Sequence, residues 1–330
     1  MVTIGPSTDN EAVLRQLLDL GVGQFRFAAS KLGFDALSRQ ADRVRSIARS
    51  RGIDVETWLD LPGTKPRLDV ASTGAVLVAG DGVRIEFGHG CERSSLRVLG
   101  MDPSQIELEK GDVFVIGDGE QALEVRSLCE GGVDTVVLFG GTLGKAKGIC
   151  IAGKPASNLS LSASDLAVLG QIEHSPFTGV IVSFCQTATD VDVARSRLAA
   201  DSMRLMAKIE SVEGARNARE IAAAADAVLL GRGDLLLDSG PIDFHACCQQ
   251  ALMGARAAGT PAYVGTQLLP SLSTMWLPHR SELSCLSQLI ADGIDGLMLA
   301  NETSTGAAPL RTVSTLLELV RRYGQEQSRP

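Results

Sequence analysis

The 330 residues exceed one average domain and carry a formal net charge of −8 at neutral pH. With 45% apolar and 21% charged residues, the composition is typical of a globular protein with a sizeable core. The negative charge and the lack of a lysine or arginine cluster argue against a nucleic-acid or anionic-membrane partner. No apolar run reaches the ~20 residues that span a bilayer, no signal peptide is evident, and the seven scattered cysteines lack metal-site spacing. We therefore expect a cytoplasmic protein with reduced thiols.

Short apolar runs alternate with amphipathic stretches of helical length along most of the chain. The apolar runs, which we expect to form strands, lie at 2–4, 23–27, 55–59, 179–184, 204–209, 227–230, 262–264 and 296–299. The amphipathic stretches, which we expect to form helices, include 10–20, 35–50, 188–199, 212–224, 244–258, 281–292 and a last one near 313–322. About eight strand–helix repeats predict an α/β fold, a (β/α)8 TIM barrel.

The segment 68–150 interrupts this alternation. It carries Gly-Asp and Gly-Gly pairs between short β-type runs such as 83–87, 113–116 and 135–138. Such pairs indicate hairpin turns. We expect a small all-β domain inserted into the barrel, whose two parts would be 1–67 and 151–330. The insertion could be a lid over the active face or a structural addition without catalytic role.

A lysine and two carboxylates lie at the ends of two successive predicted strands. Lys208 lies at the end of the run 204–209, Glu210 directly follows that run, and Asp234 follows the run 227–230. Since the carboxyl ends of barrel strands meet at one face, we expect a divalent-metal site beside a cation, with two hard oxygen ligands for Mg²⁺. Gly233 would let the backbone approach a bound carboxylate closely. The pattern predicts a site that handles a phosphate or an enolate.

Further motifs occur in order along nearly the whole chain. The opening Thr-Ile-Gly-Pro at 3–6 and the Asp-Leu-Pro-Gly-Thr-Lys-Pro-Arg segment at 60–67 are two of them. Lys-Ile-Glu at 208–210 and Gly-Arg-Gly-Asp-Leu at 231–235 form a pair. Additional matching segments lie at 147–153, 265–269, 278–282 and 298–303. Together these motifs resemble those of the pyruvate kinase family.

The resemblance implies phosphoryl transfer from phosphoenolpyruvate to ADP, through an enolate that is protonated to pyruvate. It implies that Glu210 and Asp234 hold Mg²⁺, with Mn²⁺ as an alternative, and that Lys208 neutralises the phosphoryl group in flight. Thr266 would assist enolate protonation by ordering a water. The implied substrate-binding residues are Arg26, Lys208, Gly233 and Thr266, and the implied nucleotide- or phosphate-binding residues are Ser30, Arg67 and Lys147.

Lys65 stands where many family members carry a glutamate that is associated with a bound K⁺. A lysine there resembles the subgroup in which a tethered ammonium replaces the monovalent cation, which implies that K⁺ is not required. The resemblance also implies a homo-oligomer. Because the chain ends just after the helix expected at 313–322, we expect no C-terminal regulatory domain.

Five positions depart from the family motifs, one of them being Leu236 in place of a glycine. Ala28, Lys31 and Gln186 replace an asparagine, a histidine and an arginine, and Ala300 replaces a serine. The losses leave open whether ADP is the acceptor. Two alternatives therefore stand beside the kinase: a Mg²⁺-dependent lyase or decarboxylase of 2-oxo acids or enolpyruvates that uses no nucleotide, and a non-catalytic paralogue. The choice between glycolysis and a secondary pathway is likewise open.

Overall fold

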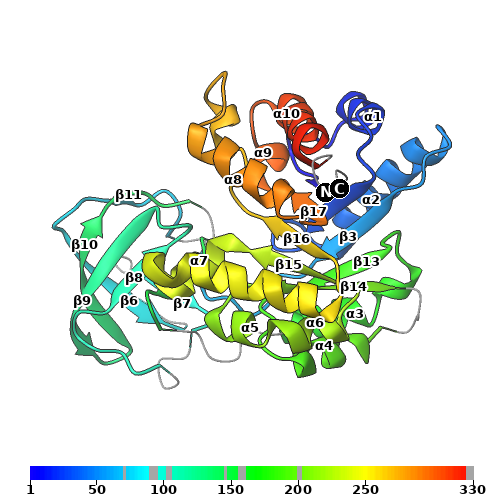
Figure 1. Cartoon of the computed structure of the whole chain (residues 1–330). Helices are drawn as coiled ribbons and strands as arrows, with labels where there is room; N and C mark the ends of the chain where they lie inside the picture. The colour runs from blue at the N-terminus through cyan, green and yellow to red at the C-terminus, as the bar shows by residue number, and fades with distance from the viewer. Residues whose placement is uncertain are drawn as a thin grey trace. The chain divides into compact units, whose positions relative to one another are not determined.

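The computed structural model describes residues 1–69, 72–88, 96–101, 106–144, 147–154, 161–198 and 203–324. The chain divides into two compact units (Figure 1). Unit 1 comprises Met1–Pro62, Leu161–Arg232 and Cys248–Pro330. Unit 2 comprises Gly63–Ser160 and Gly233–Cys247.

Unit 1 is built on a parallel sheet of eight strands. In sheet order these are β1 (Val2–Thr3), β2 (Gln24–Ala28), β3 (Glu56–Asp60), β13 (Gly179–Val182), β14 (Arg204–Ile209), β15 (Ala227–Gly231), β16 (Ala262–Gly265) and β17 (Gly296–Met298). A parallel bridge between Val2 and Leu299 joins the first strand to the residue that follows the last one. The sheet therefore closes on itself, which confirms the predicted α/β barrel (Figure 1).

Helices connect the barrel strands. They are α1 (Glu11–Asp19), α2 (Phe34–Arg49), α3 (Ala163–Leu169), α4 (Ala188–Arg195), α5 (Val212–Arg216), α6 (Ala218–Ala224), α7 (Arg232–Ala258), α8 (Arg280–Ala291), α9 (Asn301–Ser304) and α10 (Pro309–Tyr323), with the short 3-10 helices η3 (Ile172–His174) and η4 (Pro270–Ser273). None of the helices in the described part of the chain has the length and apolar character needed to cross a membrane.

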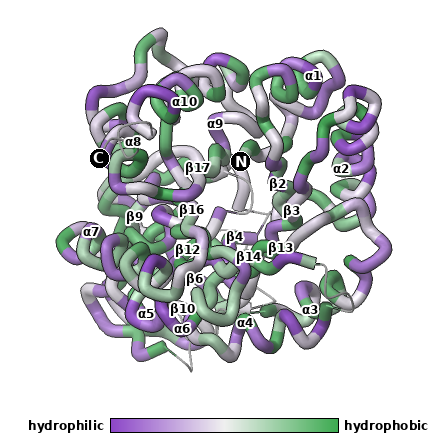
Figure 2. Tube along the Cα trace, turned by 45° about the vertical axis from the view of Figure 1, so that its right-hand side comes forward, coloured by the Kyte–Doolittle hydropathy of each residue, from purple (hydrophilic) through white to green (hydrophobic). Residues whose placement is uncertain are grey.

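The helix α2 shows how the sequence pattern becomes packing. Apolar residues recur along it at helical spacing, so that one stripe of the helix is buried and the other faces water. Figure 2 shows this as an alternation of hydrophobic and hydrophilic residues along the trace. The buried stripe consists of Leu37, Ala41, Val44, Ile47 and Ala48.

Large side chains fill part of the barrel interior. Trp58 on β3 is fully buried and belongs to a cluster with Met206 on β14 and Leu229 on β15. A Cβ atom at Gly179 would lie 2.5 Å from the Trp58 ring, so the glycine leaves the room that the indole occupies. Since the interior is packed, the chemistry of this unit is expected at the carboxyl ends of the strands.

Unit 2 consists mainly of β-structure. Its larger sheet has the order β12 (Ile149–Ile151), β8 (Val113–Ile116), β9 (Gln121–Cys129), β10 (Gly132–Phe139), β6 (Gly82–Phe87), β7 (Leu96–Leu99) and β4 (Arg67–Leu68), and a second pair joins β11 (Gly141–Thr142) to β5 (Val76–Leu77). All pairings are antiparallel except that of β6 with β7. The β-runs expected at 83–87, 113–116 and 135–138 correspond to β6, β8 and part of β10.

Two helix predictions were wrong in their bounds. A single helix was expected over 212–224, but the chain forms α5 and α6, which meet at Asn217. A helix was expected over 244–258, but α7 begins at Arg232, directly after β15. Gly240, with φ 70°, and Pro241 kink α7 and obscure its first part in the sequence pattern.

Candidate functional site

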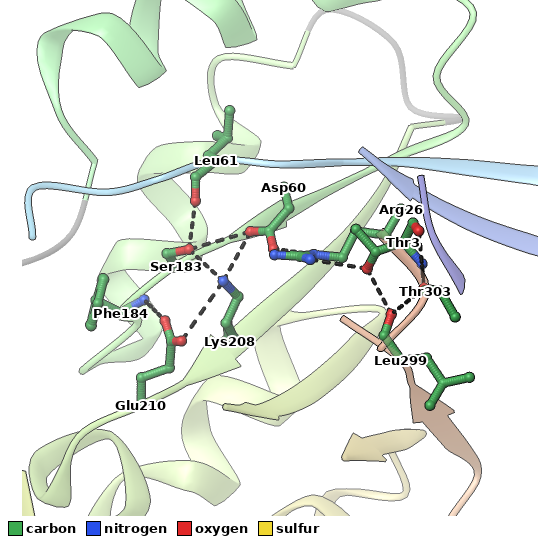
Figure 3. Close-up of polar contacts among 10 residues, drawn as sticks. All are labelled: Thr3, Arg26, Asp60, Leu61, Ser183, Phe184, Lys208, Glu210, Leu299 and Thr303. Carbon is green, nitrogen blue, oxygen red and sulfur yellow. Dashed lines mark hydrogen bonds and ion pairs between the residues drawn. The ribbon is translucent and has the colours of Figure 1, made fainter. Parts of the chain in front are cut away.

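The polar cluster at the carboxyl ends of three neighbouring barrel strands is the candidate site of unit 1 (Figure 3). Asp60 is the last residue of β3, Ser183 follows β13, and Lys208 and Glu210 lie at the end of β14. The parallel pairing of β3 with β13 and of β13 with β14 brings these ends together. All four residues are buried.

Lys208 is the centre of this cluster. Its Nζ atom lies 3.0 Å from Asp60 Oδ1 and 3.8 Å from Glu210 Oε1. It donates a hydrogen bond to Ser183 Oγ over 2.8 Å, and Ser183 donates in turn to the carbonyl of Leu61. The ammonium group is thus held at a defined position by side chains from three strands.

Arg26, on β2, extends the cluster on the other side of Asp60. Its Nε atom donates to Asp60 Oδ2 over 2.5 Å, and its Nη1 atom donates to Thr3 Oγ1 over 3.0 Å. Thr3 donates to the carbonyl of Leu299 at the point where the barrel closes. The Asp60 carboxylate therefore lies between two cations, and the arginine side chain is fixed at both ends of its guanidinium.

The buried charges determine the protonation states of the cluster. Burial by itself raises the pKa of Asp60, but Arg26 and Lys208 lower it more, and the net pKa lies below its ordinary value. Burial lowers the pKa of Lys208, but Asp60 and Glu210 raise it more, and the net pKa lies above its ordinary value. At neutral pH the cluster is an ionised network with a fixed, buried ammonium.

Glu210 presents a carboxylate whose geometry suits a hard cation. Its Oε2 atom accepts a hydrogen bond from the Phe184 backbone N–H over 3.2 Å. A Cβ atom at Gly231, the last residue of β15, would lie 2.6 Å from Glu210 Oε1. Any residue larger than glycine at position 231 would therefore clash with the Glu210 carboxylate. Carboxylate oxygens are the ligands that Mg²⁺ prefers, and this donor fits the ion. Among the described residues, no group of three or more metal-binding side chains occurs.

Unit 2 contains the other predicted charged residues. Lys65 and Asp234 form an ion pair with each other. A Cβ atom at Gly148 would lie 2.4 Å from Lys65 Cε, so the glycine leaves room for the lysine side chain. Gly233 precedes Asp234 in the first turn of α7. The predicted metal ligand and the predicted substitute for a monovalent cation are therefore direct partners.

In unit 2, Arg67 and Lys147 lie on adjacent segments, since an antiparallel bridge pairs Arg67 with Gly148 and the Leu68 N–H donates to the Lys147 carbonyl over 2.8 Å. Lys147 pairs with Glu120, with Nζ 2.6 Å from Oε2, and Arg67 begins β4 at the edge of the larger sheet. In unit 1, Ser30 is exposed in the turn after β2, and Thr266 follows β16 with the left-handed φ of 71°.

The sequence reasoning assigned no role to Asp60 or Ser183, although both make direct contacts with Lys208. A partial signal existed, because both residues lie near the carboxyl end of a predicted barrel strand, Ser183 on the strand beside that of Lys208 and Asp60 on the strand beyond it. Among the departures from the family motifs, Ala28 ends β2 and is paired with Asp60 in the sheet, so the lost asparagine is replaced by a methyl group beside this cluster.

Comparison with known proteins places these observations in context. Residues 1–313 match the family model described as pyruvate kinase, barrel domain. The pyruvate kinase of Agrobacterium vitis is 29% identical over 323 residues, covering 97% of this chain and 68% of the relative. That of Aeropyrum pernix is 30% identical over 325 residues, covering 97% and 69%. That of Mycobacterium tuberculosis is 31% identical over 327 residues, covering 96% and 68%.

Proposed function

Since the chain belongs to the pyruvate kinase family, we propose that it transfers the phosphoryl group of phosphoenolpyruvate to ADP and yields pyruvate and ATP through an enolate. Membership confirms the expected enzyme class, a pyruvate kinase-like phosphotransferase. The observation that carries the proposal is the buried ammonium of Lys208, held 3.0 Å from Asp60 and next to the Glu210 carboxylate.

Lys208 supplies a cation that needs no reorganisation during the reaction. Asp60, Ser183 and Glu210 hold its Nζ atom in place, so it can stabilise negative charge on the phosphoryl group as that group moves. The low-dielectric surroundings strengthen this effect. Arg26, fixed by Asp60 and Thr3, would present the rest of its guanidinium to a phosphate oxygen.

We assign Glu210 and Asp234 to Mg²⁺, with Mn²⁺ as a possible replacement. Glu210 directly follows β14, Asp234 follows the neighbouring β15 by three residues, and both offer carboxylate oxygens. When bound, the ion supplies charge stabilisation for the enolate oxygen of the substrate. The Gly233 backbone N–H is assigned to the substrate carboxylate, and Thr266 to proton delivery at the enolate carbon.

Arg67 and Lys147 of unit 2 and Ser30 of unit 1 are assigned to the binding of nucleotide or phosphate. Lys65 would make K⁺ unnecessary. We further propose a homo-oligomer in the cytoplasm, without nucleic-acid or membrane partners. Support for these assignments comes from the motif positions and from the net charge of −8.

The test is pyruvate release from phosphoenolpyruvate with Mg²⁺ in K⁺-free buffer, with and without ADP. We expect ADP-dependent pyruvate and an equal amount of ATP. A preparation of Lys208→Met made in the same way controls for a contaminating kinase of the expression host. If ADP does not increase pyruvate release but the Mg²⁺-dependent exchange of the pyruvate methyl protons is intact, the result would instead favour the enolate enzyme that uses no nucleotide. Four departures suggest that enzyme: Ala28, Lys31, Gln186 and Ala300. Absence of both activities would favour the non-catalytic paralogue.

A further inference from the structure

The loop after β16 has an unusual backbone conformation. Thr266 has φ 71° and Gln267 has φ 51°, so two consecutive residues with side chains are left-handed. Such conformations cost free energy for any residue other than glycine, and they persist only where the surroundings impose them. Thr266 is the residue assigned to proton delivery. Its conformation is therefore imposed by contacts with the surrounding residues and not by its own backbone preference.

Three of those contacts come from one arginine. Arg232, the first residue of α7, donates from Nε to the carbonyl of Gly265 over 3.1 Å and from Nη2 to the carbonyl of Gln267 over 3.1 Å. The same Nη2 also donates to the carbonyl of Thr266. The planar guanidinium thus binds three successive carbonyls with donors in fixed relative directions.

The opposite end of the loop is fixed by a carboxylate. The Leu268 backbone N–H donates to Glu302 Oε1 over 2.8 Å, and Glu302 is buried. Carbonyls held by a cation on one side and an amide held by an anion on the other leave the residues between them little freedom. Arg232 reaches the loop because β15, which it follows, is paired with β16.

From this geometry we infer that Arg232 is a positioning residue for the reaction: by binding the carbonyls of 265–267 it holds Thr266 and Gln267 in the left-handed form that directs Thr266 to the substrate. The role of Thr266 in this inference rests on the proposed function. The clamp, by which we mean the hydrogen bonds from Arg232 to the carbonyls of 265–267, does not depend on it. A lysine could not reproduce the clamp, because one ammonium cannot hold three carbonyls with the geometry of a planar fork.

The test is a double-mutant cycle of Arg232→Met and Thr266→Ala. The rate measured is the Mg²⁺-dependent deuterium exchange of the pyruvate methyl group at saturating pyruvate, which needs no nucleotide. A displacement of about 1 Å can lower a rate about a hundredfold, so we expect Arg232→Met to lose roughly tenfold to a hundredfold, with the KM for pyruvate little changed. In the Thr266→Ala background the same change should lose less than about twofold, because the two residues act as one unit.

Arg311→Met is the matched control. Arg311 donates to the carbonyls of Leu272 and Met275, so this variant also removes a guanidinium from loop carbonyls but leaves 265–267 untouched. Its exchange rate should equal that of the wild type. Losses that multiply in the double variant, or a wild-type rate in Arg232→Met, would overturn the inference. Arg232→Lys, the milder change, should show a loss of the same kind if Arg232→Met does not fold.

The proposed function can fail separately. If the wild type exchanges methyl protons but makes no ATP, the kinase proposal fails and the cycle still tests the clamp. If the wild type shows no exchange, crystal structures of the wild type and Arg232→Met decide. A Thr266 that stays left-handed without the arginine refutes the inference, and one that relaxes to negative φ supports it.

Discussion

Replacement of Asp60 by asparagine tests whether the charge network of unit 1 is ionised and interdependent. The substitution keeps the shape of the side chain but removes the anion between Arg26 and Lys208. Asp60 is 3% exposed, so the two cations would lose their common partner in a place that water hardly reaches. Removal of one partner from a buried ion pair typically costs about 3–5 kcal/mol.

The remaining contacts set the expected value within that range. Arg26 keeps its bond to Thr3, and Lys208 keeps Ser183 and the more distant Glu210 carboxylate. We therefore expect a loss near the lower end, about 3 kcal/mol in the free energy of unfolding of unit 1.

Urea unfolding followed by tryptophan fluorescence measures this loss. Both tryptophans of the chain, Trp58 and Trp276, belong to unit 1, so the signal reports this unit. Glu11→Gln is the control, because it removes an ion pair with Arg15 that is largely exposed, and it should cost no more than about 0.5 kcal/mol. If Asp60→Asn costs less than about 1 kcal/mol, or no more than the control, the network described above does not hold the site together.

Lys208→Met should abolish phosphoryl transfer while part of the methyl exchange of pyruvate survives, because the ammonium is assigned to the phosphoryl group; equal loss of both activities would contradict that role. Because the pKa of Asp60 is depressed, its contribution to stability is present above its ordinary pKa of 3.8 and is lost as pH falls from there through the lower pKa of the folded state. Acid unfolding of Asp60→Asn should therefore depend less on pH than that of the wild type, and parallel curves would argue against an ionised Asp60. Lys65→Glu should create a K⁺ requirement, which activity assays with and without K⁺ would reveal.

The barrel could be predicted from local patterns because its strands are continuous apolar runs. The expected strand 204–209 has the bounds of β14, and the other barrel strands differ from their predictions by one or two residues at an end. The start of α7 could not be predicted in the same way. Gly240 and Pro241 interrupt the helical periodicity there, and in a sequence such a pair indicates the end of a helix. In the folded chain the helix continues across them with a kink.

The candidate site divides along similar lines. The end of a strand could be located in the sequence, so Lys208 and Glu210 were predicted as site residues. The strand-end positions of Asp60 and Ser183 were also visible, but their contacts with Lys208 were not. The contact between Lys208 and Asp60 depends on how β3, β13 and β14 pair side by side, and the two residues are more than a hundred positions apart in the sequence. The left-handed backbone at Thr266 also had no sequence signal, since neither it nor Gln267 is a glycine.

The ion pair of Lys65 with Asp234 gives the Lys65→Glu prediction a second, sharper form. The lysine neutralises a carboxylate that we assign to Mg²⁺, so one side chain influences both the monovalent and the divalent cation. A glutamate at position 65 would replace this attraction by a repulsion between two carboxylates within unit 2, and cations would relieve it. We therefore expect K⁺ dependence and tighter Mg²⁺ binding to arise together in Lys65→Glu, measured by activity and by titration calorimetry. Lys65→Met, which removes the ammonium but adds no anion, should tighten Mg²⁺ binding without a K⁺ requirement. If Lys65→Glu gained K⁺ dependence but bound Mg²⁺ as the wild type does, the pairing of Lys65 with Asp234 would have no part in the cation requirement.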